Sequence, residues 1–189
     1  LWRVRLQRAV CDSSSLQELM SREEYLDLLN EFFEHSTEPV IEAGGEVLKF
    51  IGDAVLAIFP IEESASNVKM VSSTCIKARE TAEQIISRIS EVTHRTNKLN
   101  INCAIGLHFG EIMYGNVGSK NRLDFTATGS AVNIAARLSG ECKNLQQSFL
   151  LSSEIAQHTS KNLRSLGTKK LHNIAKTIEV FAVSGAEFG

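Results

Sequence analysis

Two short stretches of the sequence combine residue types that could do chemistry. The first is Lys49-Phe-Ile-Gly-Asp53, where a lysine and an aspartate flank a turn inside an otherwise apolar hairpin. A carboxylate fixed at a rigid turn can hold a hard cation such as Mg²⁺. The second is Asn133-Ile-Ala-Ala-Arg137, whose spacing stacks an amide and a guanidinium on one helix face. Such a pair can clamp a phosphorylated sugar. A solvated hairpin tip and a solvated helix face are the simpler interpretations.

A third stretch, Phe109–Gly118, is rich in glycine. It contains neither a P-loop nor a dinucleotide-binding fingerprint. Its glycines are therefore predicted to mark turns or a close approach of two backbone segments.

The histidines and cysteines do not form a recognisable site. No ligand spacing or nucleophile partner relates the five histidines, which we predict to be structural: His35, His94, His108, His158 and His172. The four cysteines are scattered, which argues against a zinc site or a disulfide framework and favours a reducing, cytoplasmic compartment. A net charge of −2 gives no reason to expect binding to nucleic acid or to a membrane surface, and no apolar run is long enough to span a bilayer.

The first half of the chain predicts the elements that position Lys49 and Asp53. Ser21 and Glu24 form a capping-box pattern that opens a helix, and Gly44-Gly45 ends it. Residues 47–59 predict two buried strands joined by a tight turn at Gly52-Asp53. A long helix follows, with an apolar stripe at Val68, Val71, Cys75, Ala78, Ala82, Ile86 and Ile89.

The second half predicts the elements around Asn133 and Arg137. Strict alternation over residues 101–109 indicates a half-buried strand, and residues 111–117 are expected to be its hairpin partner. A short strand near 123–127 leads into a helix over about 129–143. The remainder predicts a strand, a short helix and a final hairpin ending at 180–183. Helices packed on one mainly antiparallel sheet define an α+β class, in a single domain over residues 1–189. Because the chain begins at Leu1 and not at Met, we expect a fragment of a longer protein.

Two long segments resemble a known family. Residues 44–59 and 104–138 are similar to the two halves of the class III nucleotidyl cyclase catalytic domain, and the resemblance extends over residues 14–183. It implies the ferredoxin-like, palm-type fold of that family. It also implies conversion of ATP or GTP into a cyclic 3′,5′-monophosphate and pyrophosphate, for intracellular signalling.

The resemblance assigns roles to five residues. Asp53 matches one of two carboxylates that bind the catalytic metal ions, Mg²⁺ or Mn²⁺. Lys49 and Thr126 match the purine-reading positions, and these residue types resemble adenylate cyclases, since guanylate cyclases typically carry Glu and Cys there. Asn133 matches the residue that orients the ribose, and Arg137 matches the arginine that stabilises the phosphates. The implied partners are ATP and a second cyclase domain, either an identical copy in a head-to-tail homodimer or a related subunit.

Two features depart from the family pattern, the second smaller than the first. The first strand normally carries a second metal-binding Asp, and two possible alignments place either Ala9 or Arg5 at that position. Asp12 is the only acid nearby, displaced in register. Ser130 also replaces a common Asp. These departures favour an alternative, a degenerate nucleotide-binding or regulatory module with little catalysis. A diguanylate cyclase is a more distant alternative, suggested by Gly44-Gly-Glu46, which is more simply the end of a helix.

Overall fold

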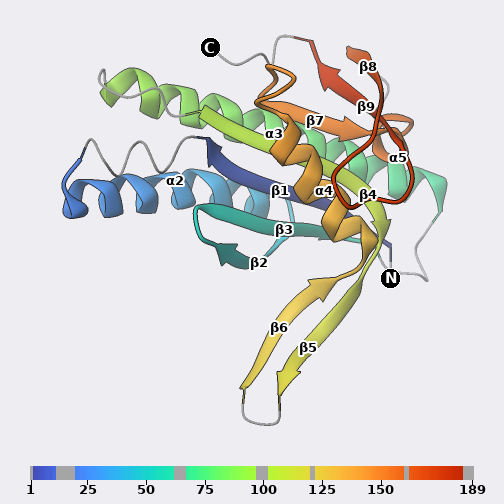
Figure 1. The fold of residues 1–189 in the computed structure, drawn as a ribbon, viewed down its shortest axis with the longest axis horizontal. Coiled ribbons are helices and arrows are strands. Elements are labelled where there is room, and N and C mark those ends of the chain that lie inside the picture. Colours follow the sequence, from blue (N-terminus) through green and yellow to red (C-terminus); the bar gives the residue numbers. More distant parts are fainter. Residues whose placement is uncertain are drawn as a thin grey trace.

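One large sheet with helices on both faces forms the body of the protein (Figure 1). The computed structural model describes residues 2–11, 20–61, 67–96, 102–119, 122–159 and 162–184. Within them the sheet runs in the order β2-β3-β1-β4-β7-β9-β8. Only the β4–β7 pair is parallel, so the predicted mainly antiparallel α+β fold is confirmed. The strands are β1 (Trp2–Cys11), β2 (Glu46–Ile51), β3 (Ala54–Pro60), β4 (Asn102–Glu111), β7 (Phe149–Ser152), β8 (Leu163–Lys169) and β9 (Ile178–Val183).

Helix α2 (Arg22–Glu42) begins and ends as its sequence predicts. The Ser21 hydroxyl accepts a hydrogen bond from the Glu24 backbone N–H at 3.2 Å, and the Glu24 carboxylate accepts one from the Ser21 N–H at 2.9 Å. This capping box satisfies two amides that the first helical turn would otherwise leave unpaired. After Glu42 the chain turns at Gly44, whose φ of +79° favours glycine.

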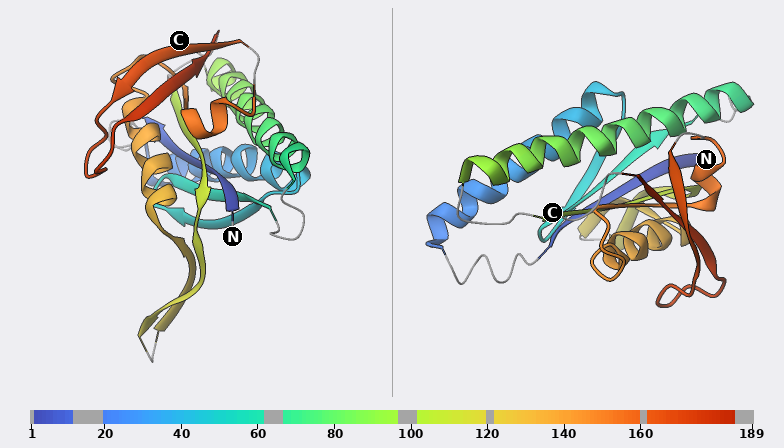
Figure 2. Two further views of the ribbon diagram at one scale, coloured as in Figure 1. Left: turned by 90° about the vertical axis from the view of Figure 1, so that its right-hand side faces the viewer. Right: turned by 90° about the horizontal axis from the view of Figure 1, so that it is seen from above.

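Helix α3 (Val68–Thr96) lies beside α2 on the same face of the sheet (Figure 2). The predicted stripe is correct at Cys75, Ala78, Ala82 and Ile89, all of which are buried. Val71 and Ile86 are half-buried against the same core, and Ile85 is fully buried beside them. The stripe is wrong at its first residue, because Val68 is 77% exposed. Among the described helices, none is both long enough and apolar enough to cross a lipid bilayer.

Strand β4 is buried on both faces, so the prediction of a half-buried strand is wrong. Helices α2 and α3 cover one face, while α4 (Ser130–Glu141) packs on the other (Figure 1). The small residues that suggested a polar face instead allow close packing: a Cβ at Gly106 would overlap the Ala135 carbonyl oxygen and lie 2.5 Å from the Ser139 nitrogen. The alternation marks two kinds of packing, not a buried and a solvated side.

A two-stranded hairpin projects from the sheet below α4 (Figure 1). It consists of β5 (Met113–Ser119) and β6 (Arg122–Thr128). The sequence predicted residues 111–117 as the partner of β4, and this is wrong, because β5 pairs with β6. The predicted order of strand, short helix and hairpin after residue 148 is confirmed, with α5 (Ser153–Ala156) as the short helix.

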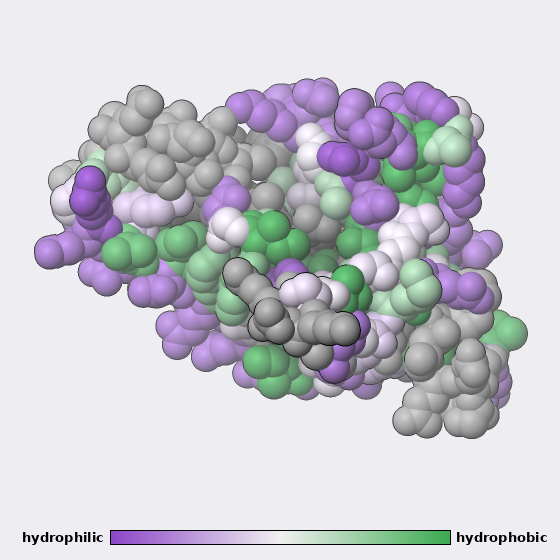
Figure 3. All heavy atoms as spheres, turned by 60° about the horizontal axis from the view of Figure 1, so that its bottom comes forward, coloured by the Kyte–Doolittle hydropathy of each residue, from purple (hydrophilic) through white to green (hydrophobic). Residues whose placement is uncertain are grey.

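Strands β2 and β3 form the predicted hairpin, but only β3 is buried. Residues 54–59 of β3 are all buried between β1 and the helices. Strand β2 lies at the edge of the sheet, where Phe50 is 53% and Ile51 48% exposed. In Figure 3, which turns the lower side of Figure 1 forward, hydrophobic surface lies in several separate patches among polar side chains.

Candidate active site

The turn between β2 and β3 carries Asp53, the predicted metal-binding carboxylate. Ile51 pairs with Ala54, so Gly52 and Asp53 form a two-residue loop. Gly52 has a φ of +60°, as the first residue of such a loop requires in a hairpin. Asp53 is partly exposed. The local sequence therefore fixes one carboxylate at a rigid turn, as predicted.

The register of β1 distinguishes the two positions proposed for the second carboxylate. Ala9 pairs with Ala54, the residue that follows Asp53, whereas Arg5 pairs with Ile58 near the other end of β3. Residues directly opposite in an antiparallel pair have Cα atoms about 4.5–5.5 Å apart. The strand position beside Asp53 is therefore that of Ala9, which has no ligating group.

The residues around this turn do not fit a pair of metal ions. Two cations about 3.5–4 Å apart need carboxylates that bridge them and offset their repulsion. Across the described ranges, no group of three or more His, Cys, Asp or Glu side chains is placed to hold a metal ion. Asp12, the other acid considered, lies outside the described residues. Asp53 by itself fits one cation whose remaining ligands come from a bound triphosphate.

A bulge in β2 determines the direction of Lys49. Val47 pairs with Ala57 but Lys49 with Leu56, so Leu48 is an extra residue in β2. Such bulges commonly redirect a side chain. Here the bulge places Lys49 on the same face as Leu48, the face that α4 covers, while Phe50 packs on Phe33 of α2 with ring centroids 4.5 Å apart. No signal in the sequence indicated this bulge.

One apolar cluster brings together sequence neighbours of three of the predicted site residues. Its buried members are Ile58, Ile112, Ala127 and Ala131, with Leu48, Tyr114 and Val132 packed against them. Leu48, Ala127 and Val132 are the chain neighbours of Lys49, Thr126 and Asn133. The cluster thus joins β2, β6 and α4 at the point where each carries a predicted site residue. A hydrogen bond of 3.0 Å from the Tyr114 hydroxyl to the Glu46 carboxylate also ties β5 to β2.

Helix α4 presents Asn133 and Arg137 outward. Its buried face consists of Ala131, Ile134, Ala135, Leu138 and Ser139, and both polar residues are exposed on the opposite face. The Ser139 hydroxyl donates to the Ala104 carbonyl at 3.0 Å. Together with the contact at Gly106, this bond fixes how α4 lies on β4, and hence where Asn133 and Arg137 stand.

The structure does not gather all five predicted residues at one point. Lys49, Thr126 and Asn133 adjoin one cluster, and Arg137 lies one helical turn beyond Asn133. Asp53 lies in the loop that follows β2, whereas Lys49 lies within β2, two residues before its end. Strand β1 lies between β3, which follows Asp53, and β4, on which α4 packs.

A buried polar group that no sequence pattern indicated supports β4 beneath α4. His108 shares the face of β4 that carries Gly106 and Gly110, and its Nδ1 lies 2.7 Å from the Ser152 hydroxyl and 3.8 Å from the Glu154 carboxylate. Burial acts to raise the pKa of Glu154. Hydrogen bonds from its own backbone N–H, from Ser152 and from Lys176, with the attraction of His108, outweigh burial and lower this pKa below 4.5. Because 44 residues separate His108 from Ser152, no local pattern could predict the contact.

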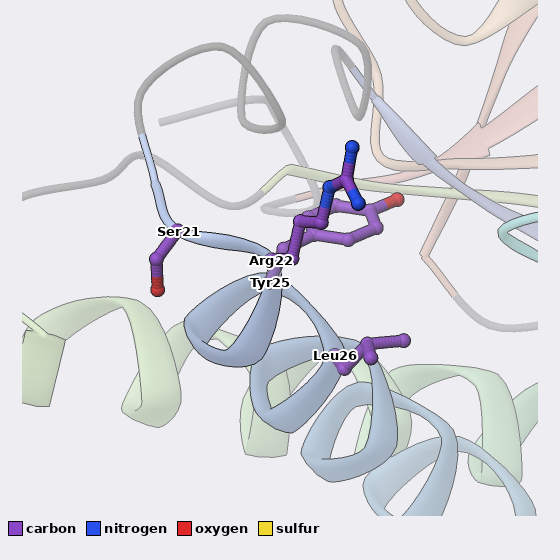
Figure 4. Close-up of a pocket in the computed structure, with 4 residues that line it drawn as sticks. All are labelled: Ser21, Arg22, Tyr25 and Leu26. Atoms are coloured by element: carbon purple, nitrogen blue, oxygen red, sulfur yellow. The ribbon is translucent and has the colours of Figure 1, made fainter.

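A cavity of about 350 Å³ lies at the start of α2 (Figure 4). Its described lining is Ser21, Arg22, Tyr25 and Leu26. None of the five predicted site residues lines it, and the Ser21 hydroxyl is engaged in capping the helix. The cavity is therefore not the candidate site.

Comparison with known proteins connects this geometry to a family. The family model for the adenylate and guanylate cyclase catalytic domain matches residues 8–177. The terminal-differentiation-specific adenylate cyclase of Dictyostelium discoideum is 28% identical over 174 residues, 92% of this chain and 8% of that protein. The adenylate cyclase of Anabaena cylindrica is 29% identical over 147 residues, 78% of this chain and 28% of that protein.

The fold agrees with the same assignment. A bacterial light-regulated adenylyl cyclase superposes with a TM-score of 0.83 and 28% identity, over 99% of this chain and 92% of that one. This chain spans less than a third of the length of the curated relatives named above. Because the family match covers most of the sequence, the chain belongs to the adenylate and guanylate cyclase catalytic domain family.

Proposed function

We propose that this chain binds ATP and takes part in its conversion to 3′,5′-cyclic AMP and pyrophosphate, for cyclic-nucleotide signalling. The observation that supports the proposal is the apolar cluster that joins β2, β6 and α4 through Leu48, Ala127 and Val132, the sequence neighbours of Lys49, Thr126 and Asn133, with Arg137 one turn further along α4. We call Lys49, Thr126, Asn133 and Arg137 the substrate half of the site. Positions Asp53 and Ala9 form the carboxylate half. Relatives named adenylate cyclases support the choice of reaction.

In this proposal Lys49 and Thr126 select the purine. The Lys49 ammonium donates to N1 of adenine, which is an acceptor, whereas N1 of guanine carries a hydrogen and is a donor. Two donors that face each other in a desolvated site cost roughly 1–3 kcal/mol. ATP is therefore preferred to GTP by about one to two decades.

In this proposal Asn133 binds the ribose and Arg137 binds the phosphates. The Asn133 amide orients the ribose so that its 3′-oxygen can attack the α-phosphorus in line. The bond between O3′ and phosphorus forms, the bond to the pyrophosphate oxygen breaks, and the proton of the 3′-hydroxyl passes to water. Charge accumulates on the phosphate oxygens, and the forked donors of Arg137 neutralise it.

A divalent cation, Mg²⁺ or Mn²⁺, is implied by the family. A two-metal site needs both carboxylates, and this chain has Asp53 but Ala9 at the second position. The two-metal form of the reaction is therefore proposed only for a site in which both positions carry a carboxylate. For this chain alone we propose one cation, bound mainly through the triphosphate.

We propose that the site forms between two cyclase domains arranged head to tail. The exposed apolar side chains of the projecting hairpin and of the edge strand support contact with a second domain. Met113 is 72% and Val117 51% exposed on β5, and Phe50 is 53% and Ile51 48% exposed on β2. The compartment we propose is the cytoplasm, since the described cysteines Cys75, Cys103 and Cys142 are buried and none forms a disulfide.

The direct test is to incubate the purified chain with ATP and either Mn²⁺ or Mg²⁺, and to quantify cyclic AMP alongside nucleotide affinity by calorimetry. We expect binding of the metal–ATP complex, slow cyclisation, and more product with Mn²⁺, which generally binds oxygen and nitrogen ligands more tightly. Equal affinity for ATP and GTP would contradict the roles of Lys49 and Thr126.

A second candidate function is a nucleotide-binding regulatory module without catalysis. Ala9 beside Ala54 is the observation that favours it. The variant Ala9→Asp distinguishes the two. This variant creates the missing carboxylate and should raise cyclic AMP production if the substrate half can support catalysis. A module that only binds nucleotide would still produce no cyclic AMP.

A further inference from the structure

A hydrogen bond between two residues outside the proposed substrate contacts joins the projecting hairpin to the edge of the main sheet. The Tyr114 hydroxyl of β5 donates to the Glu46 carboxylate of β2 at 3.0 Å, although 68 residues separate the two in the chain. Tyr114 also packs against the apolar cluster that joins β2, β6 and α4. The hydroxyl can therefore be removed while the ring keeps its place in the cluster.

On the hairpin, this bond begins beside Thr126. Tyr114 pairs with Ala127, the residue that follows Thr126. Gly115, which follows Tyr114, pairs with Thr126 itself. The ladder between β5 and β6 has no register shift, so the two strands move as one unit. A contact that holds Tyr114 in place therefore also holds Thr126.

On the main sheet, the bond ends just before the bulge that redirects Lys49. Glu46 pairs with Ile58 of β3, and Lys49 pairs with Leu56. Leu56 and Ile58 are two residues apart in one strand and so share one face of the sheet. Glu46 therefore lies on the same face as Lys49, with the bulge residue Leu48 between them.

The position of the hairpin relative to β2 depends on contacts near its base. Strands β5 and β6 pair with each other and form a sheet of their own (Figure 1), and a two-stranded sheet alone is only marginally stable. Apolar contacts in the cluster have no preferred direction, whereas a hydrogen bond to a carboxylate is both strong and directional. The Tyr114–Glu46 bond therefore restricts the separation of β6 from β2 more closely than apolar packing does.

We infer that Tyr114 and Glu46 are positioning residues for base selection. Their hydrogen bond keeps Thr126 of β6 at a fixed separation from Lys49 of β2, and neither of the two touches the nucleotide. Two groups that read one purine must both lie within hydrogen-bond distance of it, and a misplacement of about 1 Å is enough to lose a large part of such recognition. The inference rests on the proposed function and specifies what holds its purine-reading pair together.

The test measures the affinities of α,β-methylene-ATP and α,β-methylene-GTP by calorimetry in the presence of Mn²⁺. Because binding is the readout, no second carboxylate is needed. The unmodified chain should prefer the ATP analogue by about one to two decades. Tyr114→Phe removes only the hydroxyl, and should lower this preference by about 3–10-fold. Its affinity for the GTP analogue and its unfolding temperature should change little.

Glu46 provides a second and independent way to remove the bond. Glu46→Ala deletes the acceptor at an exposed position, so the core packing stays intact, and it should lower the preference as much as Tyr114→Phe does. The double variant Tyr114→Phe/Glu46→Ala should lower it no further, because both changes remove the same bond. Glu46→Gln keeps an acceptor oxygen and should retain part of the preference.

The chain offers a matched control for each partner. Tyr25 is the other tyrosine of the sequence and is half-buried on α2, as Tyr114 is on β5. Glu91 is exposed on α3. Neither belongs to the substrate half or to the carboxylate half of the site. Tyr25→Phe and Glu91→Ala should therefore leave the ratio of the two affinities unchanged.

The outcomes separate the inference from the proposed function. An unchanged ratio in Tyr114→Phe and Glu46→Ala, with the ratio lost in Lys49→Glu, overturns the inference and leaves the proposed function standing. An equal loss of affinity for both analogues also overturns it, because the bond would then only stabilise the hairpin, and so do additive effects in the double variant. If the unmodified chain binds neither analogue, or binds both equally, the proposed function fails and the inference fails with it.

Discussion

The substrate half and the carboxylate half of this domain are built in different ways. The substrate half depends on tertiary packing: a bulge redirects Lys49, an apolar cluster joins three elements, and α4 lies in close contact with β4 at Gly106. The carboxylate half needs only a two-residue turn and the end of one strand. The place of the carboxylates therefore depends on local backbone structure, whereas the place of the substrate residues depends on contacts between elements far apart in the sequence.

The largest effect should come from the substrate half itself. In the Ala9→Asp background, Arg137→Ala should lower kcat by roughly 10²–10³-fold, as removal of a group that stabilises transition-state charge does. Arg137→Lys keeps the charge but loses the forked donors, and should give an intermediate rate. Steady-state cyclic AMP production measures both. Ser130→Ala, exposed on the same helix, is the control, and a loss in Arg137→Ala no greater than in Ser130→Ala would contradict the role of Arg137.

The packing beneath α4 gives the next largest effect. Gly106→Ala inserts a methyl group against the backbone of α4, and overpacking of this kind costs typically about 1–3 kcal/mol of folding free energy. Gly140→Ala lies within α4 and meets nothing within 4 Å, so it should instead stabilise by about 0.4–1 kcal/mol. Urea denaturation of both variants measures the contrast. Equal stability of the two variants would show that α4 is less tightly held than the contact implies.

Base selection should show a smaller change. In the Ala9→Asp background, Lys49→Glu replaces the donor facing N1 of the purine by an acceptor, and should erode a preference for ATP of about one to two decades. The ratio of kcat/KM for ATP and GTP measures it. Lys69, exposed near the start of α3, offers the control Lys69→Glu, which makes the same charge change away from the site. An unchanged ratio in Lys49→Glu would remove Lys49 from base recognition.

The sequence predicts the carboxylate half better than the substrate half, for a physical reason. Gly52-Asp53 is a local turn signal, and the structure has that turn. The environment of Lys49 depends on an edge strand and a bulge, which neighbouring elements determine and no local pattern reveals. The same limit explains the error at β5: alternation shows that a segment is extended, but not with which strand it pairs. The family resemblance indicated both halves, yet only the strand register distinguished Ala9 from Arg5.

The smallest expected effect concerns the polar group beneath α4 and appears as a pH dependence of stability. The pKa of Glu154 lies below its ordinary value of 4.5 in the folded protein, since hydrogen bonds and His108 outweigh the effect of burial. A lowered folded pKa means that the contribution is complete above pH 4.5 and is lost as the pH falls through the folded value. Because Glu154 is partly exposed and solvent screens its interactions, this contribution should stay below about 1 kcal/mol.

Urea denaturation at pH 7 and below pH 4 tests this for Glu154→Gln against Glu179→Gln, an exposed glutamate on β9. The unmodified protein and Glu179→Gln should lose more stability on acidification than Glu154→Gln, which has no carboxylate to protonate there. If all three proteins lose the same stability on acidification, the interactions of the Glu154 carboxylate with His108 and Ser152 do not contribute to the stability of the sheet beneath α4. The position of α4 on β4 would then depend on apolar packing and on the Ser139–Ala104 hydrogen bond.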